Sequence, residues 1–89
     1  MEKSAIPQKY GFKSKNRTES GGFPDFFLDA DDQCIVVEAK KQSIEDASED
    51  VRFYMQYNKI RKDLIGIAVA GQTKRLLKTR YYYKRAEDD

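Results

Sequence analysis

The sequence contains no histidine and no tryptophan, and it has a single cysteine, Cys34. The absence of histidine excludes Ser-His-Asp and Cys-His nucleophilic catalysis, and also metal sites that depend on imidazole. A lone cysteine without histidine can form neither an internal disulfide nor a structural zinc site, and it fits a reducing cytoplasmic setting. Any metal must therefore be bound by carboxylate and carbonyl oxygens, which suit Mg²⁺, Mn²⁺ or Ca²⁺.

Long hydrophobic runs are also absent. No apolar stretch reaches the roughly 18 residues of a membrane span, and the first residues lack the apolar region of a signal peptide. We therefore expect a cytoplasmic protein that has no membrane partner. With 89 residues, the chain has the length of one small domain. We interpret 23–71 as its core, 1–22 as a basic N-terminal segment, and 74–85 as a basic, tyrosine-rich strand before an acidic tail.

The net charge of +2 conceals an uneven distribution along the chain. Residues 19–58 carry ten acids and three Lys or Arg, whereas 1–18 and 59–86 together carry fourteen Lys or Arg and two acids. Basic flanks around an acidic centre could place an anionic polymer against an acidic metal site. Solvated surface charge is the simpler interpretation, and composition alone favours it.

Two short runs rich in aromatic and β-branched residues, 26–28 and 34–37, predict a β-hairpin. Acidic turn residues lie between them. A loop of two or four residues gives the same register, in which the numbers of paired residues sum to 63. Asp25 is then directly opposite Glu38, with about 5 Å between their Cβ atoms.

A helix is predicted over 43–60, because Ser43 can act as its N-cap and Glu45 and Asp46 occupy its first turn. The apolar run 64–70 predicts a strand buried on both faces, parallel to the second hairpin strand. The helix then becomes the crossover of a right-handed βαβ unit, and 76–83 could pair as an edge strand. The expected fold class is α/β, a small mixed sheet with a hairpin and a crossover helix.

Strand alternation places Glu38 and Lys40 on one face of the sheet, which Asp25 shares in the predicted register. Two neighbouring carboxylates repel each other unless a cation lies between them. A Mg²⁺ or Mn²⁺ ion would remove that repulsion, and the carbonyl of Ala39 could add a hard ligand. Lys40 could then orient or deprotonate a metal-bound water, or stabilise the transition state. The simpler interpretation is a surface Glu-Ala-Lys at a strand end, with Asp25 as a turn residue.

Segments 22–28 (Gly-Phe-Pro-Asp-Phe-Phe-Leu) and 35–41 (Ile-Val-Val-Glu-Ala-Lys-Lys) resemble the PD-(D/E)xK, restriction-endonuclease-like nuclease superfamily. The resemblance is closest to nuclease domains of type I restriction subunits and of fused restriction–methyltransferase proteins. It implies a restriction-endonuclease-like core in which Asp25 and Glu38 bind Mg²⁺ and Lys40 is catalytic.

The same resemblance implies supporting residues around this triad. Restriction nucleases of this kind often carry Gln-x-x-x-Tyr on the following helix, and the matching positions here are Asp50 and Tyr54, with Gln56 as a weaker candidate. A helix before the first catalytic strand often bears a further metal-binding glutamate, for which Glu19 is the candidate. Only 24 residues precede Asp25, which implies a trimmed upstream helix or a minimal domain.

Function follows as an expectation from these residues. The first hypothesis is Mg²⁺-dependent DNA hydrolysis by a cleavage module that works with other domains or subunits of a restriction–modification enzyme. The alternative is a non-catalytic module that keeps the fold and binds nucleic acid or a partner. Double-strand cleavage by one small site would need two events or two copies, so a homodimer is compatible with the first hypothesis. The candidate DNA-binding residues, which solvated loop charge would explain as well, are Lys13, Lys15, Arg17, Lys41, Lys74 and Arg75.

Overall fold

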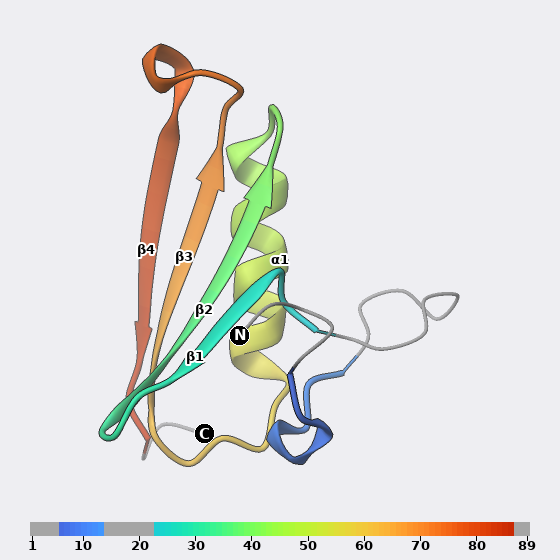
Figure 1. The fold of residues 1–89 in the computed structure, drawn as a ribbon, viewed down its shortest axis with the longest axis vertical. Coiled ribbons are helices and arrows are strands. Elements are labelled where there is room, and N and C mark those ends of the chain that lie inside the picture. Colours follow the sequence, from blue (N-terminus) through green and yellow to red (C-terminus); the bar gives the residue numbers. More distant parts are fainter. Residues whose placement is uncertain (1–5, 14–22, 87–89) are drawn as a thin grey trace.

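The computed structural model describes residues 6–13 and 23–86. These residues form a four-stranded mixed sheet with the strand order β1-β2-β3-β4, and one helix, α1, packs against it (Figure 1). The elements are η2 (Gln8–Tyr10), β1 (Phe26–Asp29), β2 (Gln33–Lys40), α1 (Ile44–Gln56), β3 (Asp63–Ala70), η3 (Lys74–Leu76) and β4 (Lys78–Lys84). The predicted α/β class is therefore confirmed. Within the described residues, no helix is long and apolar enough to cross a lipid bilayer.

The hairpin has the predicted register. Strands β1 and β2 pair antiparallel, with Phe26 opposite Val37 and Asp29 opposite Cys34, so each pair sums to 63. The Ala30 N–H donates to the Gln33 carbonyl at 2.9 Å and closes the turn. Extending this register by one residue beyond Phe26 places Asp25 opposite Glu38.

Helix α1 begins as predicted and ends earlier. Ser43 is the N-cap, and its Oγ accepts a hydrogen bond from the Asp46 N–H at 3.1 Å. The helix stops at Gln56 rather than near residue 60. The reason is Asn58, whose side-chain amide donates to the carbonyls of Tyr54 and Met55, each at 2.8 Å. These bonds occupy carbonyls that would accept backbone N–H groups if the helix continued.

The prediction that the third strand is buried on both faces is wrong. Strand β3 does pair parallel with β2, and α1 joins the two. Leu64, Gly66, Ala68 and Ala70 are buried beneath α1, whereas the residues that alternate with them are only half-buried. Among the described residues a single α-helix covers one face of the sheet, and on the other face the side chains of β3 are half-buried between those of β2 and β4.

Gly66 sets how closely α1 approaches the sheet. A Cβ atom at this position would overlap the Sδ atom of Met55 and a methyl group of Val51. Strand β4 pairs antiparallel with β3 beyond it, which confirms the predicted edge strand.

Residues 6–13 pack on the core through aromatic rings. The turn η2 lies in this segment and ends at Gly11, whose φ of 70° is left-handed. Its Tyr10 ring lies 4.6 Å, and the Phe12 ring 5.3 Å, from the fully buried Phe27 ring, measured between centroids. The Tyr10 hydroxyl donates to Asp29 at 2.7 Å, and Lys62 donates to the same carboxylate at 2.7 Å. This group, which we call the Asp29 clamp, ties residues 6–13 and the start of β3 to the hairpin turn.

Candidate active site

The three residues of the predicted triad lie at one end of the sheet, where β1 begins and β2 ends. Asp25 is exposed and precedes β1, and its carboxylate accepts a hydrogen bond from the Ala39 N–H at 3.0 Å. Glu38 is only 4% exposed, and strand alternation turns it toward α1. The hairpin register therefore brings the Asp25 carboxylate to the backbone next to Glu38.

Lys40 forms an ion pair with a buried acid on the helix. Its Nζ atom lies 2.9 Å from Oδ2 of Asp50, which is 8% exposed, while the Lys40 side chain is itself 42% exposed. The hydrogen bond to Asp50 holds the pKa of Lys40 above its ordinary value, against the effect of desolvation. The charges of Glu38 and Asp25 raise the pKa of Lys40 further. Lys40 is thus an ammonium group among three carboxylates.

The backbone of Ala39 adds an oxygen to this group. The N–H and C=O of a residue in an extended strand point toward the same neighbour. Because the Ala39 N–H donates to Asp25, its carbonyl is directed to the Asp25 side of β2. The next carbonyl, of Lys40, points the other way and accepts the Gly71 N–H at 3.2 Å.

The donor atoms at this end of the sheet are hard oxygens. No group of three or more Asp, Glu, Cys or His side chains that could hold a metal occurs among residues 6–13 and 23–86. Two carboxylates and one carbonyl remain, from Asp25, Glu38 and Ala39. This set fits Mg²⁺ by its chemistry, because protein-bound Mg²⁺ usually takes one or two carboxylates and keeps several waters.

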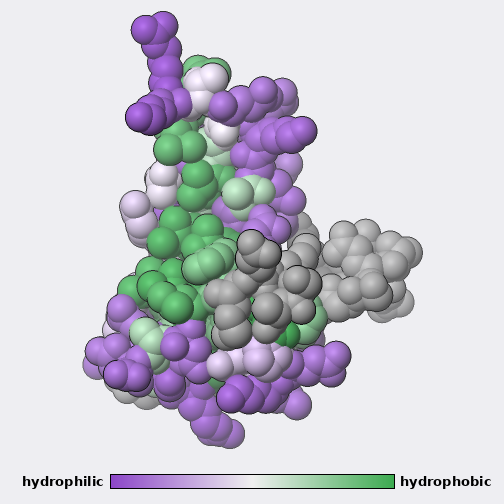
Figure 2. All heavy atoms as spheres, in the orientation of Figure 1, coloured by the Kyte–Doolittle hydropathy of each residue, from purple (hydrophilic) through white to green (hydrophobic). Residues whose placement is uncertain are grey.

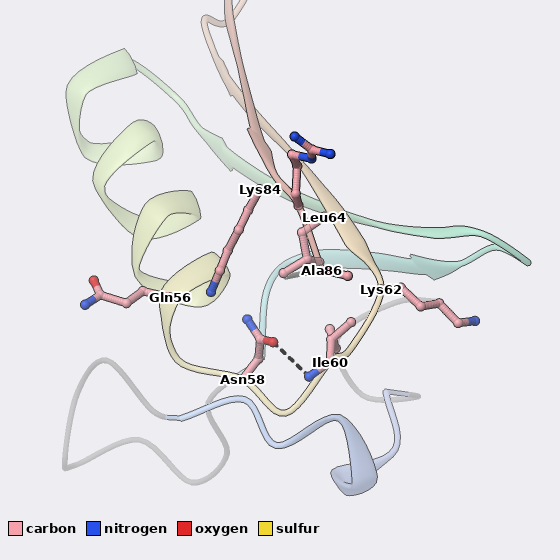
Figure 3. A pocket seen from close by; sticks show the side chains of 8 residues that line it. Gln56, Asn58, Ile60, Lys62, Leu64, Lys84 and Ala86 are labelled. Carbon is pink, nitrogen blue, oxygen red and sulfur yellow. Dashed lines mark hydrogen bonds between the residues drawn. The ribbon is translucent and has the colours of Figure 1, made fainter. Parts of the chain in front are cut away.

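The supporting residues predicted on the helix lie in two different places. Tyr54 lies one helical turn after Asp50 and is buried, and its ring packs edge-on against Phe12 with centroids 5.9 Å apart. Gln56 is not brought to the site. It ends α1 and lines a polar cleft of about 230 Å³ together with Asn58 and Lys84, at the opposite end of the sheet (Figure 3).

The candidate DNA-binding residues are likewise divided. Lys41 is exposed directly after β2. Lys74 and Arg75 are exposed in η3, which follows β3 at the same end of the sheet as Lys40. Lys13 lies elsewhere, because its N–H donates to the Tyr57 carbonyl beyond the far end of α1. Lys15, Arg17 and Glu19 are outside the described residues.

Asp50 has a closer relation to the triad than the family resemblance implies. The resemblance gives it only as the match to the Gln of Gln-x-x-x-Tyr, whereas the structure shows it as the direct ion-pair partner of Lys40. The available signal was its place on the sheet-facing side of the helix, three residues after Ala47 and one turn before Tyr54. A charge on such a face needs a partner of opposite sign.

No family model matches this chain, and no curated protein or solved structure is found to be similar to it. Its function must therefore be inferred from the residues and their geometry.

Proposed function

We propose that this chain is a Mg²⁺-dependent DNA phosphodiesterase with a restriction-endonuclease-like core. It would serve as the cleavage module of a restriction–modification-type protein. One observation carries the proposal: the hairpin register gathers the acids Asp25 and Glu38 around Lys40, at an end of the sheet where Asp25 and Lys40 reach the surface. Two carboxylates beside a lysine provide both a place for a divalent cation and a positive charge for a phosphate.

The roles of the chain's own residues follow from their placement. Asp25, Glu38 and the Ala39 carbonyl would hold the metal ion. When bound, that ion supplies a Lewis acid for the phosphodiester and a lowered pKa for a water nucleophile. Lys40 is held by Asp50 as an ammonium group, which favours stabilising negative charge on the transferred phosphoryl group over accepting a proton. Asp50 keeps the flexible lysine side chain anchored to α1.

Nearby cations are placed to bind the phosphate backbone. Lys41, Lys74 and Arg75 are exposed at the same end of the sheet as the triad. Contacts of this kind position a duplex without reading its sequence. Target recognition is therefore assigned to other domains or subunits.

The alternative is a non-catalytic module that binds nucleic acid or a partner through the same fold. Two observations favour it. Asp50 engages the lysine that catalysis needs, and the described residues contain no group of three acidic side chains placed to hold a metal ion. In this interpretation the Lys40–Asp50 ion pair links β2 to α1 and has no chemical role.

Cleavage of supercoiled plasmid DNA, with and without Mg²⁺ or Mn²⁺, tests the proposal. Lys40→Ala and Asp25→Asn should each lower metal-dependent cleavage by at least about 100-fold. The matched controls Arg61→Ala and Asp31→Asn alter exposed residues near the opposite end of the sheet and should cleave as wild type does. Undiminished cleavage by Lys40→Ala would refute the catalytic assignment. DNA binding without metal binding in calorimetry would favour the non-catalytic module.

A further inference from the structure

The face of the sheet that α1 leaves open is continuously hydrophobic. Two rows of side chains cross all four strands in register. The first row is Phe26, Val37, Ile67 and Tyr81, and the second is Leu28, Ile35, Ile65 and Tyr83. Figure 2 shows hydrophobic atoms gathered over the strands, with hydrophilic residues above and below them. We call these eight residues the open face.

The exposed area of the open face is large for so small a protein. Phe26 and Leu28 are 42% and 44% exposed, and Tyr81 and Tyr83 are 71% and 59% exposed. Since an aromatic side chain can bury roughly 150–250 Å², the three rings alone present about 300 Å². With Leu28 and the half-buried aliphatic residues, the face offers on the order of 500 Å². Two such faces packed together would bury about 1,000 Å² in total, near the lower limit for a specific protein–protein interface.

The chemistry of the open face suits protein better than nucleic acid. Its eight side chains include no cation, since alternation along β4 turns Tyr81 and Tyr83 to this face and Arg80 to the other. Arg80 pairs with Glu45 of α1 at 3.2 Å on the helical side. The basic and aromatic residues of β4, which together suggest a nucleic-acid-binding stripe in sequence, are thus separated in space.

Charge at the two edges of the sheet selects the partner and its orientation. The β1 edge is acidic, because its turn carries the exposed Asp31 and Asp32. At the same end of the sheet as this turn, the exposed Arg85 follows β4, whereas the cations within β4 alternate to the helical side. A second copy turned about a two-fold axis parallel to the strands would lay its β1 over β4 of the first copy. An in-plane axis perpendicular to the strands would instead lay β1 over β1 and carry the acidic turn of the second copy to the other end of the sheet, away from Arg85.

We propose that the open face is a self-association surface, on which a second copy of this chain packs as a β-sandwich about a two-fold axis parallel to the strands. Sheets packed in this way lie about 10 Å apart with nearly aligned strands. The rows then complement each other, with Phe26 over Tyr81, Val37 over Ile67 and Leu28 over Tyr83 of the second copy. The interface is isologous, and each acidic turn meets the basic end of the opposite β4.

This arrangement leaves the candidate active site accessible. Glu38 and Asp50 lie on the helical side of the sheet, away from the open face. The dimer therefore carries two sites on opposite outer surfaces. Self-association does not depend on nuclease activity, so the two proposals can fail separately.

Sedimentation equilibrium of the full chain tests the proposal over about 5–500 µM, a range suited to the weak affinity expected of a small interface. The mass should rise from 10.4 kDa toward twice that value. Tyr81→Ser should raise the dissociation constant at least about tenfold, because exposed aromatic anchors dominate interfaces of this kind. Leu76→Ser removes an exposed side chain outside the face, in η3, and should leave it unchanged. Circular dichroism verifies that both variants are folded.

Charge reversal tests the orientation of the axis. Asp32→Lys and Arg85→Glu should each weaken the dimer about three- to tenfold at low salt, and the double variant should restore it. Failure of the double variant to restore the dimer overturns the parallel axis. A wild-type chain that stays monomeric at every concentration overturns the interface itself. The interface is also overturned if the chain remains monomeric, binds a thymidine oligonucleotide, and loses that binding in Tyr81→Ser.

Discussion

Replacing Asp29 by asparagine should lower the stability of the protein in a pH-dependent way. The Asp29 carboxylate accepts hydrogen bonds from Lys62, Tyr10 and Cys34, and its side chain is 24% exposed. The Lys62 hydrogen bond, then that of Tyr10, lowers the pKa of Asp29 from 3.8 to about 2. A carboxyl group with a lowered pKa contributes stability that is fully present above its unfolded pKa. That stability is lost as the pH falls from about 4 through about 2.

The magnitude follows from the same shift. A pKa difference of this size corresponds to an upper limit of about 2.5 kcal/mol. Because the Lys62 side chain is 41% exposed and solvent screens its charge, we expect about 1–2 kcal/mol. Asp29→Asn should therefore lower the free energy of unfolding by that amount at pH 7. The difference between wild type and variant should shrink as the pH falls toward 2.

Urea denaturation followed by far-ultraviolet circular dichroism measures this effect, since the chain has no tryptophan to report by fluorescence. Unfolding is compared at pH 7, 4, 3 and 2. The control Asp32→Asn removes an exposed acid from the same turn and should change stability by less than about 0.5 kcal/mol. A stability difference between wild type and Asp29→Asn that is equal at pH 7 and pH 2 would refute the reasoning.

Three further substitutions have definite expected outcomes. Gly66→Ala should destabilise the protein by about 1–3 kcal/mol in thermal unfolding, because the added methyl group overlaps Met55. Gly71→Ala cannot serve as its control, because Gly71 has a φ of +135° that strains any other residue. Tyr10→Phe removes a hydrogen bond to a carboxylate and should cost about 1.5–3 kcal/mol at pH 7. The Asp29 hydrogen bond raises the Tyr10 pKa to about 12, so this cost should fade as the pH rises from 10 through 12. Asn58→Ala should cost about 1 kcal/mol in urea denaturation by exposing the last carbonyls of α1, and an unchanged midpoint would contradict that role.

Local features of the sequence were sufficient for the hairpin and for the start of the helix. A strand repeats every two residues, and a short even loop joined the two runs, so the register that aligns Asp25 with Glu38 needed no distant contact. Ser43 likewise caps α1 through a bond to an amide three residues away. The absence of histidine restricted the chemistry to carboxylates, lysine and hard metal ions before any fold was known.

The remaining features depend on contacts between distant segments. Asp50 meets Lys40 only because α1 crosses back over β2, and the Asp29 clamp joins residues up to 33 positions apart. The hydrophobic run of β3 could not show which face would be covered, because pairing on both edges and burial on both faces favour the same residue types. The sequence alone therefore determined the chemical character of the candidate site and the pairing of its two strands. Tertiary packing decided the partner of its lysine and left one face of the sheet open, because those outcomes depend on where the single described helix lies.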